Sequence, residues 1–273
     1  QSSSRGLGDV YKRQILFENN DLPGIMLSKS MRHYCNRWGV IPGQHISIYT
    51  NNDDGWETAK DLKEAGCNVI CIIDQRPDIN PPIKNIDYVL GRKIAKAYGN
   101  LRISSIKLDN GKIIKTDCLA VSGGFNPNLH LTCHQRGRPK WDELNHCFIP
   151  NNPPKNMSVI GAANGIFNYQ DIFKDSKIKL TKILQNLGHK KVSIEEVKIS
   201  NRVYKVSPFP KNIPEGKVWV DLQNDVTVKD IKLAVHEGFH SVELLKRYTT
   251  LGMATDQGKN CLLYTSPSPR DED

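Results

Sequence analysis

The sequence has no apolar run approaching the roughly 20 residues that a membrane-spanning helix needs. It has no secretory leader ahead of Ile15, and its cysteines form no C-x-x-C pair and follow no regular spacing. We therefore expect a cytoplasmic protein without a membrane partner. Its thiols should be reduced and mostly buried: Cys35, Cys67, Cys71, Cys118, Cys133 and Cys147.

Residue pairs that carry out covalent chemistry are also missing. No nucleophile and base are identifiable as a pair, and no two carboxylates share one face of an expected element. We therefore assign no catalytic residue. If the chain takes part in redox chemistry, a cofactor must supply it and the protein must position that cofactor.

Residues 1–14 and 261–273 lack helical and strand periodicity and resemble translated sequencing-adapter read-through. We expect both segments to be non-native extensions outside the fold. The remaining chain shows no domain-edge signal at either end, so we expect an internal fragment of a longer polypeptide. Its length suffices for one large or two modest hydrophobic cores.

Positive charge exceeds negative charge, with a net charge of +9. The lysines are densest where apolar residues recur at helical spacing, which favours a solvated amphipathic helix face. Attraction to acidic metabolites or partners is the second interpretation, and nucleic acid comes last, so we expect no nucleic-acid partner. The lysines concerned are Lys174, Lys177, Lys179, Lys182, Lys190 and Lys191.

Residues 45–74 are predicted to form a strand, a turn, a helix and a strand, the layout of a nucleotide-binding βαβ unit. In such units phosphates lie against the helix N-terminus, and an acid ending the second strand binds a ribose hydroxyl. A free carboxylate there repels a 2′-phosphate, which favours NAD over NADP. We predict cofactor-binding roles for Thr50, Asn51, Asn52, Gly55 and Asp74.

The turn of this unit departs from the usual G-x-G-x-x-G pattern, because it has one glycine and two acids, Asp53 and Asp54. Acids repel a pyrophosphate. A Rossmann-like unit without a bound dinucleotide is therefore the alternative, and the sequence alone leaves both interpretations open.

Elsewhere the periodicity alternates between helix and strand. Asp109-Asn110-Gly111 predicts a hairpin turn, and Thr227 with Asp230 predicts a capping box. Residues 192–206 fit no single element type. The expected helices are 27–38, 92–98, 177–187, 228–237 and 242–250, and the expected strands outside the βαβ unit are 101–108, 112–121 and 157–160.

Two small-residue segments permit close backbone approach to a ligand: Gly123-Gly124 after the hairpin, and Gly161-Ala162 after the expected strand 157–160. A βαβ unit, a small antiparallel meander and a strand running into glycines is the order found in two-dinucleotide-domain flavoproteins. In that α/β architecture both segments line the first dinucleotide site. We therefore predict that Gly123, Gly124, Gly161 and Ala162 bind the cofactor.

Histidines and cysteines gather in residues 130–147, but the H-x2-C-H spacing has no matching second pair. The cationic side chains of this stretch, Arg136, Arg138 and Lys140, would repel a metal ion. We expect no metal site. A loop that presents Arg136 and Arg138 to a ligand phosphate or a partner subunit, and a solvated loop, remain alternatives.

Four strings carry a family resemblance: FENNDLPGIMLS, TNNDDGWETA, LAVSGGFNPNLHLTCHQRGRP and DLQNDVTVKDIKLAVHEGFHSVELLKRYTTLGMATDQGK. They resemble the alpha subunit of heterotetrameric sarcosine oxidase across nearly all of residues 15–260. The resemblance implies an oxidoreductase acting on CH–NH donors. Its complex demethylates sarcosine to glycine and passes the one-carbon unit to tetrahydrofolate.

The resemblance also implies cofactors and partners. NAD belongs to the alpha subunit, FAD and FMN lie in or are shared with the beta subunit, and gamma and delta subunits complete the heterotetramer. The folate domain would follow residue 260, so we expect the isolated fragment to be inactive. The C-terminal helices resemble small iron-sulfur modules but lack the cysteines, so packing between domains is the role that remains.

The resemblance gives a domain layout for a two-dinucleotide-domain scaffold that is incomplete at its N-terminus. It has a first dinucleotide domain with a connecting hairpin (15–42 and 91–190), an inserted Rossmann-like domain (43–90), a linker (191–217) and a helical module (218–260). The βαβ unit then becomes a second or vestigial site. A complex acting on another amine, such as proline or glycine, and a non-catalytic scaffold subunit that holds nucleotide remain alternatives.

Overall fold

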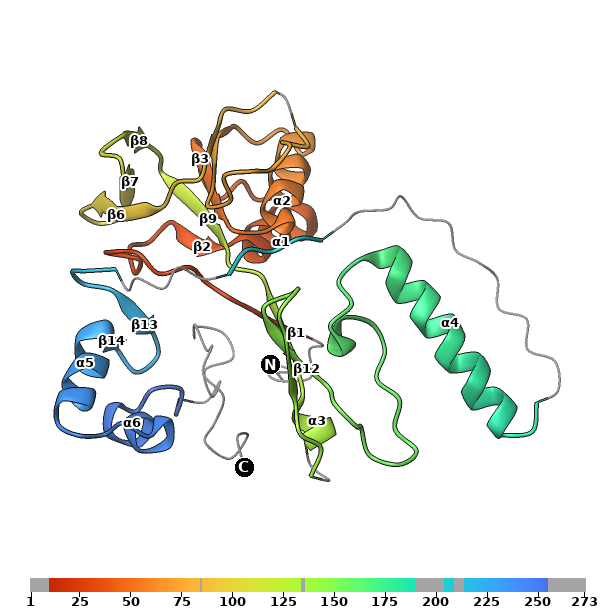
Figure 1. Cartoon of the computed structure of the whole chain (residues 1–273). Helices are drawn as coiled ribbons and strands as arrows, with labels where there is room; N and C mark the ends of the chain where they lie inside the picture. Colours follow the sequence, from red (N-terminus) through yellow and green to blue (C-terminus); the bar gives the residue numbers. More distant parts are fainter. Residues whose placement is uncertain (1–9, 84, 134–135, 190–203, 209–213, 255–273) are drawn as a thin grey trace. The chain divides into compact units, whose positions relative to one another are not determined.

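The computed structural model describes residues 10–83, 85–133, 136–189, 204–208 and 214–254. The chain divides into two compact units, one formed by residues 1–11 and 125–205, the other by residues 12–124 and 206–273. Figure 1 labels many of the helices and strands of both units.

A five-stranded parallel sheet forms the centre of the larger unit. Its strands follow the order β2 (Ile25–Leu27), β9 (Cys118–Ser122), β3 (Ile46–Thr50), β4 (Val69–Asp74) and β5 (Tyr88–Leu90). All four neighbouring pairs are parallel. This Rossmann-like sheet confirms the predicted α/β fold class.

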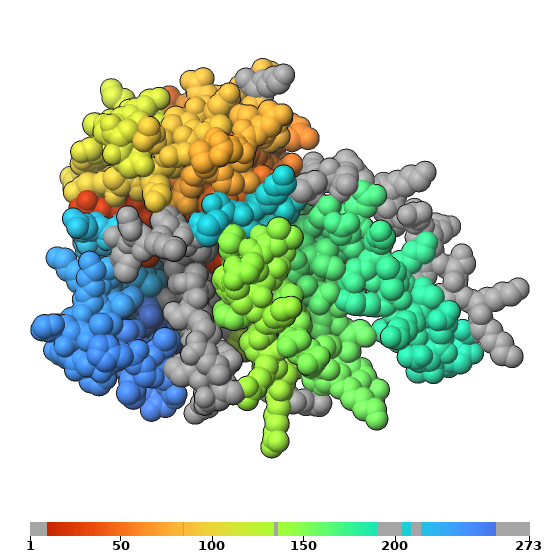
Figure 2. Space-filling view, in the orientation of Figure 1, coloured from red at the N-terminus to blue at the C-terminus, as the bar shows by residue number. Residues whose placement is uncertain are grey.

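Both faces of the sheet are covered, as buried parallel strands require. On one face Ile46 and Ile48 pack with Trp56 and Leu62 of α2 (Asp53–Glu64) and with Met31 of α1 (Ser28–Trp38). On the other face Tyr49, Ile73 and Val121 pack against an antiparallel meander of β6 (Ile94–Gly99), β7 (Ile103–Leu108) and β8 (Ile113–Lys115). In the space-filling view the βαβ unit and the meander form one continuous mass (Figure 2).

The predicted βαβ unit is confirmed as β3, α2 and β4, and the predicted helix 27–38 is confirmed as α1. The short helix predicted for residues 92–98 is wrong, because these residues enter strand β6 and pair with β7. Lysine and alanine favour a helix locally, yet pairing with a neighbouring strand overrides that preference.

The predicted hairpin turn is confirmed, but its second strand is shorter than expected. The expected strand 112–121 is two strands, β8 in the meander and β9 in the parallel sheet, separated at Thr116-Asp117. The Thr116 hydroxyl donates to the carbonyl of His45 at 2.7 Å, which fixes the point where the chain passes between sheets. A backbone carbonyl remote in sequence therefore helps to set this break.

A small helical module completes the larger unit. It contains β13 (Trp219–Asp221), β14 (Val226–Thr227), α5 (Val228–His236) and α6 (Val242–Thr249) around a valine-rich core with Leu251. The predicted capping box is confirmed, since Thr227 and Asp230 bond reciprocally at the start of α5. The bounds of both helices agree with the sequence prediction to within one residue.

The smaller unit contains short elements and one long helix. Strand β1 (Val10–Lys12) joins β10 (Phe125–Pro127), and β11 (Lys140–Asp142) pairs with β12 (Cys147–Ile149). Helix α3 (His130–Cys133), the 3-10 turn η1 (Gly161–Asn164) and helix α4 (Tyr169–Asn186) complete it. Lys12 of β1 belongs to the larger unit.

Residues 10–12 form strand β1 although their sequence has no strand period, because strand pairing uses backbone groups that any sequence supplies. That residues 1–14 are a non-native extension stays a prediction. Two other expectations fail in this region. Residues 157–160 form no strand, since no described strand pairs with them. Helix α4 begins eight residues earlier than predicted, at a cap where Asn168 accepts from the amide of Gln170. The expectations for 192–203 fall outside the described residues.

Of the six described cysteines, Cys67, Cys71, Cys118 and Cys147 are buried, which confirms that the thiols are mostly buried. In the part of the chain that the structure describes, no helix combines the length and apolar character that crossing a bilayer requires.

Candidate functional site

Three strands of the parallel sheet end side by side. Thr50 at the end of β3 is in register with Asp74 at the end of β4 and with Ser122 at the end of β9. Ligands of open α/β sheets bind outside the carboxyl ends of the strands. Among the predicted site residues, Thr50, Asn51, Asn52, Gly55 and Asp74 therefore gather at the expected place, and Gly123-Gly124 follow directly after β9.

The polar turn after β3 is bonded within the protein. The Asn52 side chain donates to the Ser122 carbonyl at 2.8 Å and to Asn51 Oδ1 at 2.9 Å. Its Oδ1 accepts from the amide of Asp54 at 2.9 Å and from the Ser122 hydroxyl at 3.2 Å. Thr50, Asn51 and Asn52 are completely buried. Asn52 thus acts as the N-cap of α2, and its capacity for hydrogen bonds is used inside the fold.

A remote segment of the same unit lies against this turn. Asn52 forms a β-bridge with Val206, and the amide of Ser207 donates to the Asn51 carbonyl at 2.8 Å. The Asn51 side chain donates in return to the Ser207 carbonyl at 3.1 Å. Residues 206–207 therefore occupy the edge where the diphosphate of a dinucleotide would approach the turn.

Asp74 stands where a ribose-binding acid is expected, yet its carboxylate meets protein groups. It accepts from Trp56 Nε1 at 2.7 Å, from the Arg76 amide at 2.9 Å and from Arg76 Nη2 at 2.7 Å. The side chain is completely buried. A ribose hydroxyl would have to displace Trp56 or Arg76 to reach it.

Arg76 joins Asp74 to the start of α2, because its Nη1 donates to Asp53 at 2.7 Å. Burial lowers the pKa of Arg76, but the hydrogen bonds and charges of Asp74 and Asp53 outweigh burial and raise the pKa above its ordinary value. Asp53, an acid that is unsuited to a phosphate loop, is therefore paired with Arg76. Asp54 is paired with Arg32. Asp53 and Asp54 also lie in the first turn of α2, where negative charge stabilises the helix.

Gly55 is required by packing. A Cβ at this position would lie 2.4 Å from Oγ1 of Thr50, so only glycine lets α2 approach β3 this closely. This is the helix-to-strand packing role of a Rossmann glycine, without the part that contacts a pyrophosphate.

The predicted glycine set is divided between the two units. In the larger unit, a Cβ on Gly123 would lie 2.6 Å from the Arg13 carbonyl, and the Gly124 carbonyl accepts from the Arg13 amide at 2.9 Å. In the smaller unit, Gly161 has a φ of 67° and begins η1, followed by Ala162. That Gly123, Gly124, Gly161 and Ala162 bind one dinucleotide stays a prediction.

Four residues of this site were not predicted from the sequence: Trp56, Arg76, Ser122 and Ser207. Arg76 had a detectable signal, since a cation two residues after an expected strand-end carboxylate can pair with it. Ser207 had none, because it lies 156 residues from the asparagine that it contacts. Within the described residues no group of three or more His, Cys, Asp or Glu side chains is arranged to hold a metal ion.

Comparison with known proteins identifies relatives along most of the chain. Residues 215–268 match the model of the sarcosine oxidase A3 domain. The chain is 38% identical over 260 residues to sarcosine oxidase subunit alpha of Rhizobium meliloti (strain 1021), covering 91% of this chain and 26% of that protein. Identity to the Corynebacterium sp. (strain U-96) subunit alpha is 32% over 274 residues, covering 92% and 28%.

Among solved structures, L-proline dehydrogenase from P. horikoshii superposes with a TM-score of 0.69 over 94% of this chain and 50% of that chain. Its sequence identity is 20%, so the likeness establishes a shared fold. Matched along 91% of its length and spanning 26% of the Rhizobium relative, the chain belongs to the family of sarcosine oxidase alpha subunits and represents a part of such a subunit.

Proposed function

We propose that this chain is part of the alpha subunit of a complex that oxidatively demethylates sarcosine to glycine and transfers the one-carbon unit to tetrahydrofolate. The observation that carries the proposal is 38% identity to a sarcosine oxidase alpha subunit over 91% of the chain. The described residues contribute a scaffold to this complex and no amine-oxidising group, so the chain alone has no turnover.

The proposed partners are beta, gamma and delta subunits, with FAD and FMN in or shared with the beta subunit. NAD is held by the alpha subunit, with Gly123, Gly124, Gly161 and Ala162 as its binding residues. The residues of the βαβ unit do not fit that dinucleotide, because Asn51, Asn52 and Asp74 already meet protein partners. No step of the reaction is therefore assigned to this unit, whose role is architectural.

Purification of the intact subunit with its complex tests the activity. We expect oxidation of sarcosine, measured by glycine formation, with folate-dependent capture of the one-carbon unit. Proline and glycine serve as competing substrates in parallel assays. Oxidation of proline or glycine in place of sarcosine would assign the chain to a related complex that acts on that amine. If none of the three is oxidised, the alternative of a non-catalytic scaffold subunit is favoured.

The cofactor proposal has a separate readout. Denaturing the purified complex should release NAD in proportion to the alpha subunit, measured by chromatography and mass spectrometry. Ala162→Asp places a carboxylate in the proposed site and should lower the released NAD several-fold. Ala95→Asp, at an exposed position of β6, is the matched control and should leave it unchanged. Release of no adenine nucleotide from the unmodified complex contradicts NAD binding.

A further inference from the structure

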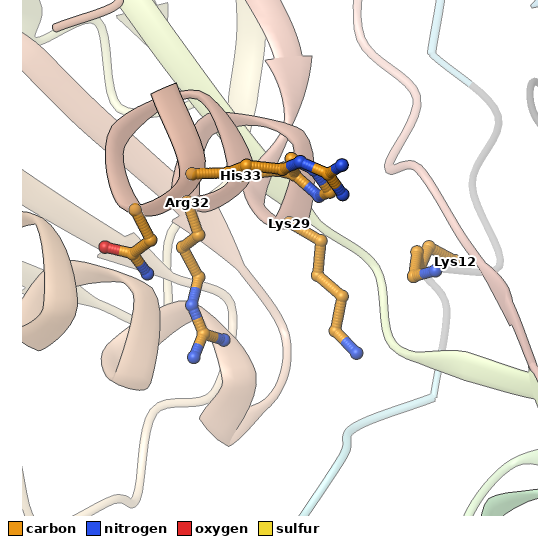
Figure 3. Close-up of a pocket in the computed structure, with 6 residues that line it drawn as sticks. Lys12, Lys29, Arg32 and His33 are labelled. Carbon is orange, nitrogen blue, oxygen red and sulfur yellow. The ribbon is translucent and has the colours of Figure 1, made fainter. Parts of the chain in front are cut away.

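A cavity of about 360 Å³ lies beside helix α1 in the larger unit. Figure 3 shows Lys29 extending from α1 into the space between this helix and Lys12, with Arg32 on the neighbouring turn. The lining residues are Lys12, Lys29, Arg32, His33, Asn36 and Arg37.

Helix periodicity brings most of this lining together. Arg32, His33, Asn36 and Arg37 lie three, four, seven and eight residues after Lys29, so the five side chains share one face of α1. The helix is held in place from its other side, where Met31 is completely buried against the parallel sheet. The cationic face is therefore fixed by the core of the unit.

The cavity carries a strong excess of positive charge. Four of its six lining residues are lysine or arginine, and none is a carboxylate. Arg32 pairs with Asp54 at 3.2 Å and also with Asp61, which anchors its guanidinium to α2. Arg37 lies over the Trp38 ring, 5.6 Å from its centroid. Because two carboxylates already compensate Arg32, the attraction of this surface for an anion comes from the lysines and from Arg37.

We propose that this cavity binds a small ligand through a diphosphate group. Its volume lies at the lower end of the range for small-molecule sites, about 300–1,000 Å³. Planar guanidinium groups suit paired phosphate oxygens, and Asn36 and His33 add polar donors beside them. Lys12 lies in the segment that we predict to be non-native, and Arg32 is held by its acidic partners on α2, so the site rests on Lys29 and Arg37.

Titration calorimetry with inorganic pyrophosphate, on the full chain at about 0.15 M salt, tests the site, because that salt concentration screens diffuse surface attraction. The test variant is Lys29→Gln/Arg37→Gln, which spares Arg32 and its partners on α2. We expect saturable binding that this double variant weakens at least tenfold. The matched control, Lys229→Gln/Lys232→Gln, removes the same charge from the exposed face of α5 and should change affinity less than twofold.

Arg37→Lys keeps the charge but removes the planar guanidinium, and it should weaken binding by a smaller factor than Arg37→Gln. Circular dichroism checks that each variant is folded. Competition by NAD identifies a dinucleotide as the source of the diphosphate, whereas pyrophosphate binding without NAD competition identifies a smaller diphosphate. The proposal fails if the unmodified chain binds no pyrophosphate saturably, or if the α5 control loses as much affinity as the α1 variant.

Discussion

The carboxylate of Asp74 is a buried negative charge that one cation and two neutral donors stabilise, the neutral donors being Trp56 Nε1 and the Arg76 amide. Arg76 supplies the charge at 2.7 Å, and Trp56 donates from the opposite element, helix α2. Removing a partner from a buried ion pair costs far more than the pair contributes, because the remaining charge stays without water.

Arg76→Met should therefore destabilise the fold by about 3–5 kcal/mol. The measurement is the free energy of unfolding from urea titration. Adding Asp74→Asn in the same chain removes the uncompensated charge and should recover more than half of the loss. Equal stability of Arg76→Met and the unmodified chain would show that water reaches Asp74.

Asp221 has a comparable role in the helical module, where it is completely buried. Its Oδ1 accepts from the amide of Gln223 at 2.9 Å, and its Oδ2 accepts from the amide of Gly252 at 2.8 Å. The carboxylate thus connects the turn after β13 to the segment after α6.

Asp221→Asn replaces one acceptor oxygen by an NH2 group that cannot accept. We expect a loss of about 1–3 kcal/mol in the free energy of unfolding, with faster hydrogen exchange at the Gly252 amide. Asp225→Asn is the matched control at an exposed position, and it should change stability by less than about 0.5 kcal/mol. Unchanged exchange at Gly252 would contradict the proposed connection.

At the scale of elements, the segment 206–207 and the turn after β3 stabilise each other through backbone groups. The Ser207 amide is a donor in this contact, at 2.8 Å from the Asn51 carbonyl, so a residue without that amide hydrogen should break it.

Ser207→Pro should lower the free energy of unfolding by about 1–3 kcal/mol, because it leaves the buried Asn51 carbonyl without its donor. Ser207→Ala keeps the backbone amide and should remain within about 0.5 kcal/mol of the unmodified chain. Hydrogen exchange in the first turn of α2 should quicken in the proline variant alone. Equal free energies of unfolding and equal hydrogen exchange in the two variants would show that residues 206–207 do not stabilise the turn after β3.

Sequence periodicity predicted the elements whose signals are local. Strand β3, helix α2 and strand β4 were predicted because β-branched runs enclose a helical pattern, and the Thr227 cap was predicted from a four-residue motif. Strand β6 was not predicted, because its residues favour a helix until β7 lies beside them. Pairing between distant segments supplies the information that a local window lacks.

The position of the candidate site could be predicted from the sequence. That other protein groups already form hydrogen bonds with its side chains could not. Thr50, Asn52 and Asp74 were placed correctly at the strand ends, since that follows from the order of elements. The partners that satisfy them, above all Ser207, come from a part of the chain with no local signal. The domain boundaries, which concern the intact protein, stay a prediction.

At the scale of the whole molecule, burial makes the thiols weak acids. Burial raises the pKa of Cys71 to about 11 and, with the charge of Asp117, that of Cys118 to about 11. The pKa of Cys67 also rises to about 11, through burial and its hydrogen bond with Cys35. The neutral thiol is the form that the folded state favours.

Stability should therefore be fully present below the unfolded thiol pKa of about 8.5 and decline as the pH rises toward 11. Unfolding midpoints between pH 8 and 11 measure the decline in stability, and the double variant Cys71→Ala/Cys118→Ala should make it smaller. An unfolding midpoint that is independent of pH over this range contradicts the raised pKa values of the buried thiols.

The reactivity of the thiols gives a second measurement. At pH 8 the exposed Cys133 should react with a thiol reagent before the buried cysteines do.

The order of strands in the parallel sheet has a consequence for synthesis on the ribosome. Strand β9 is the last of the five in sequence, yet it lies between β2 and β3. Until Ser122 has emerged, β2 and β3 therefore each present an unpaired edge on which other chains can add. A product truncated anywhere between Leu90 and Ser122 keeps both edges open, and we expect it to aggregate where the longer chain stays dispersed.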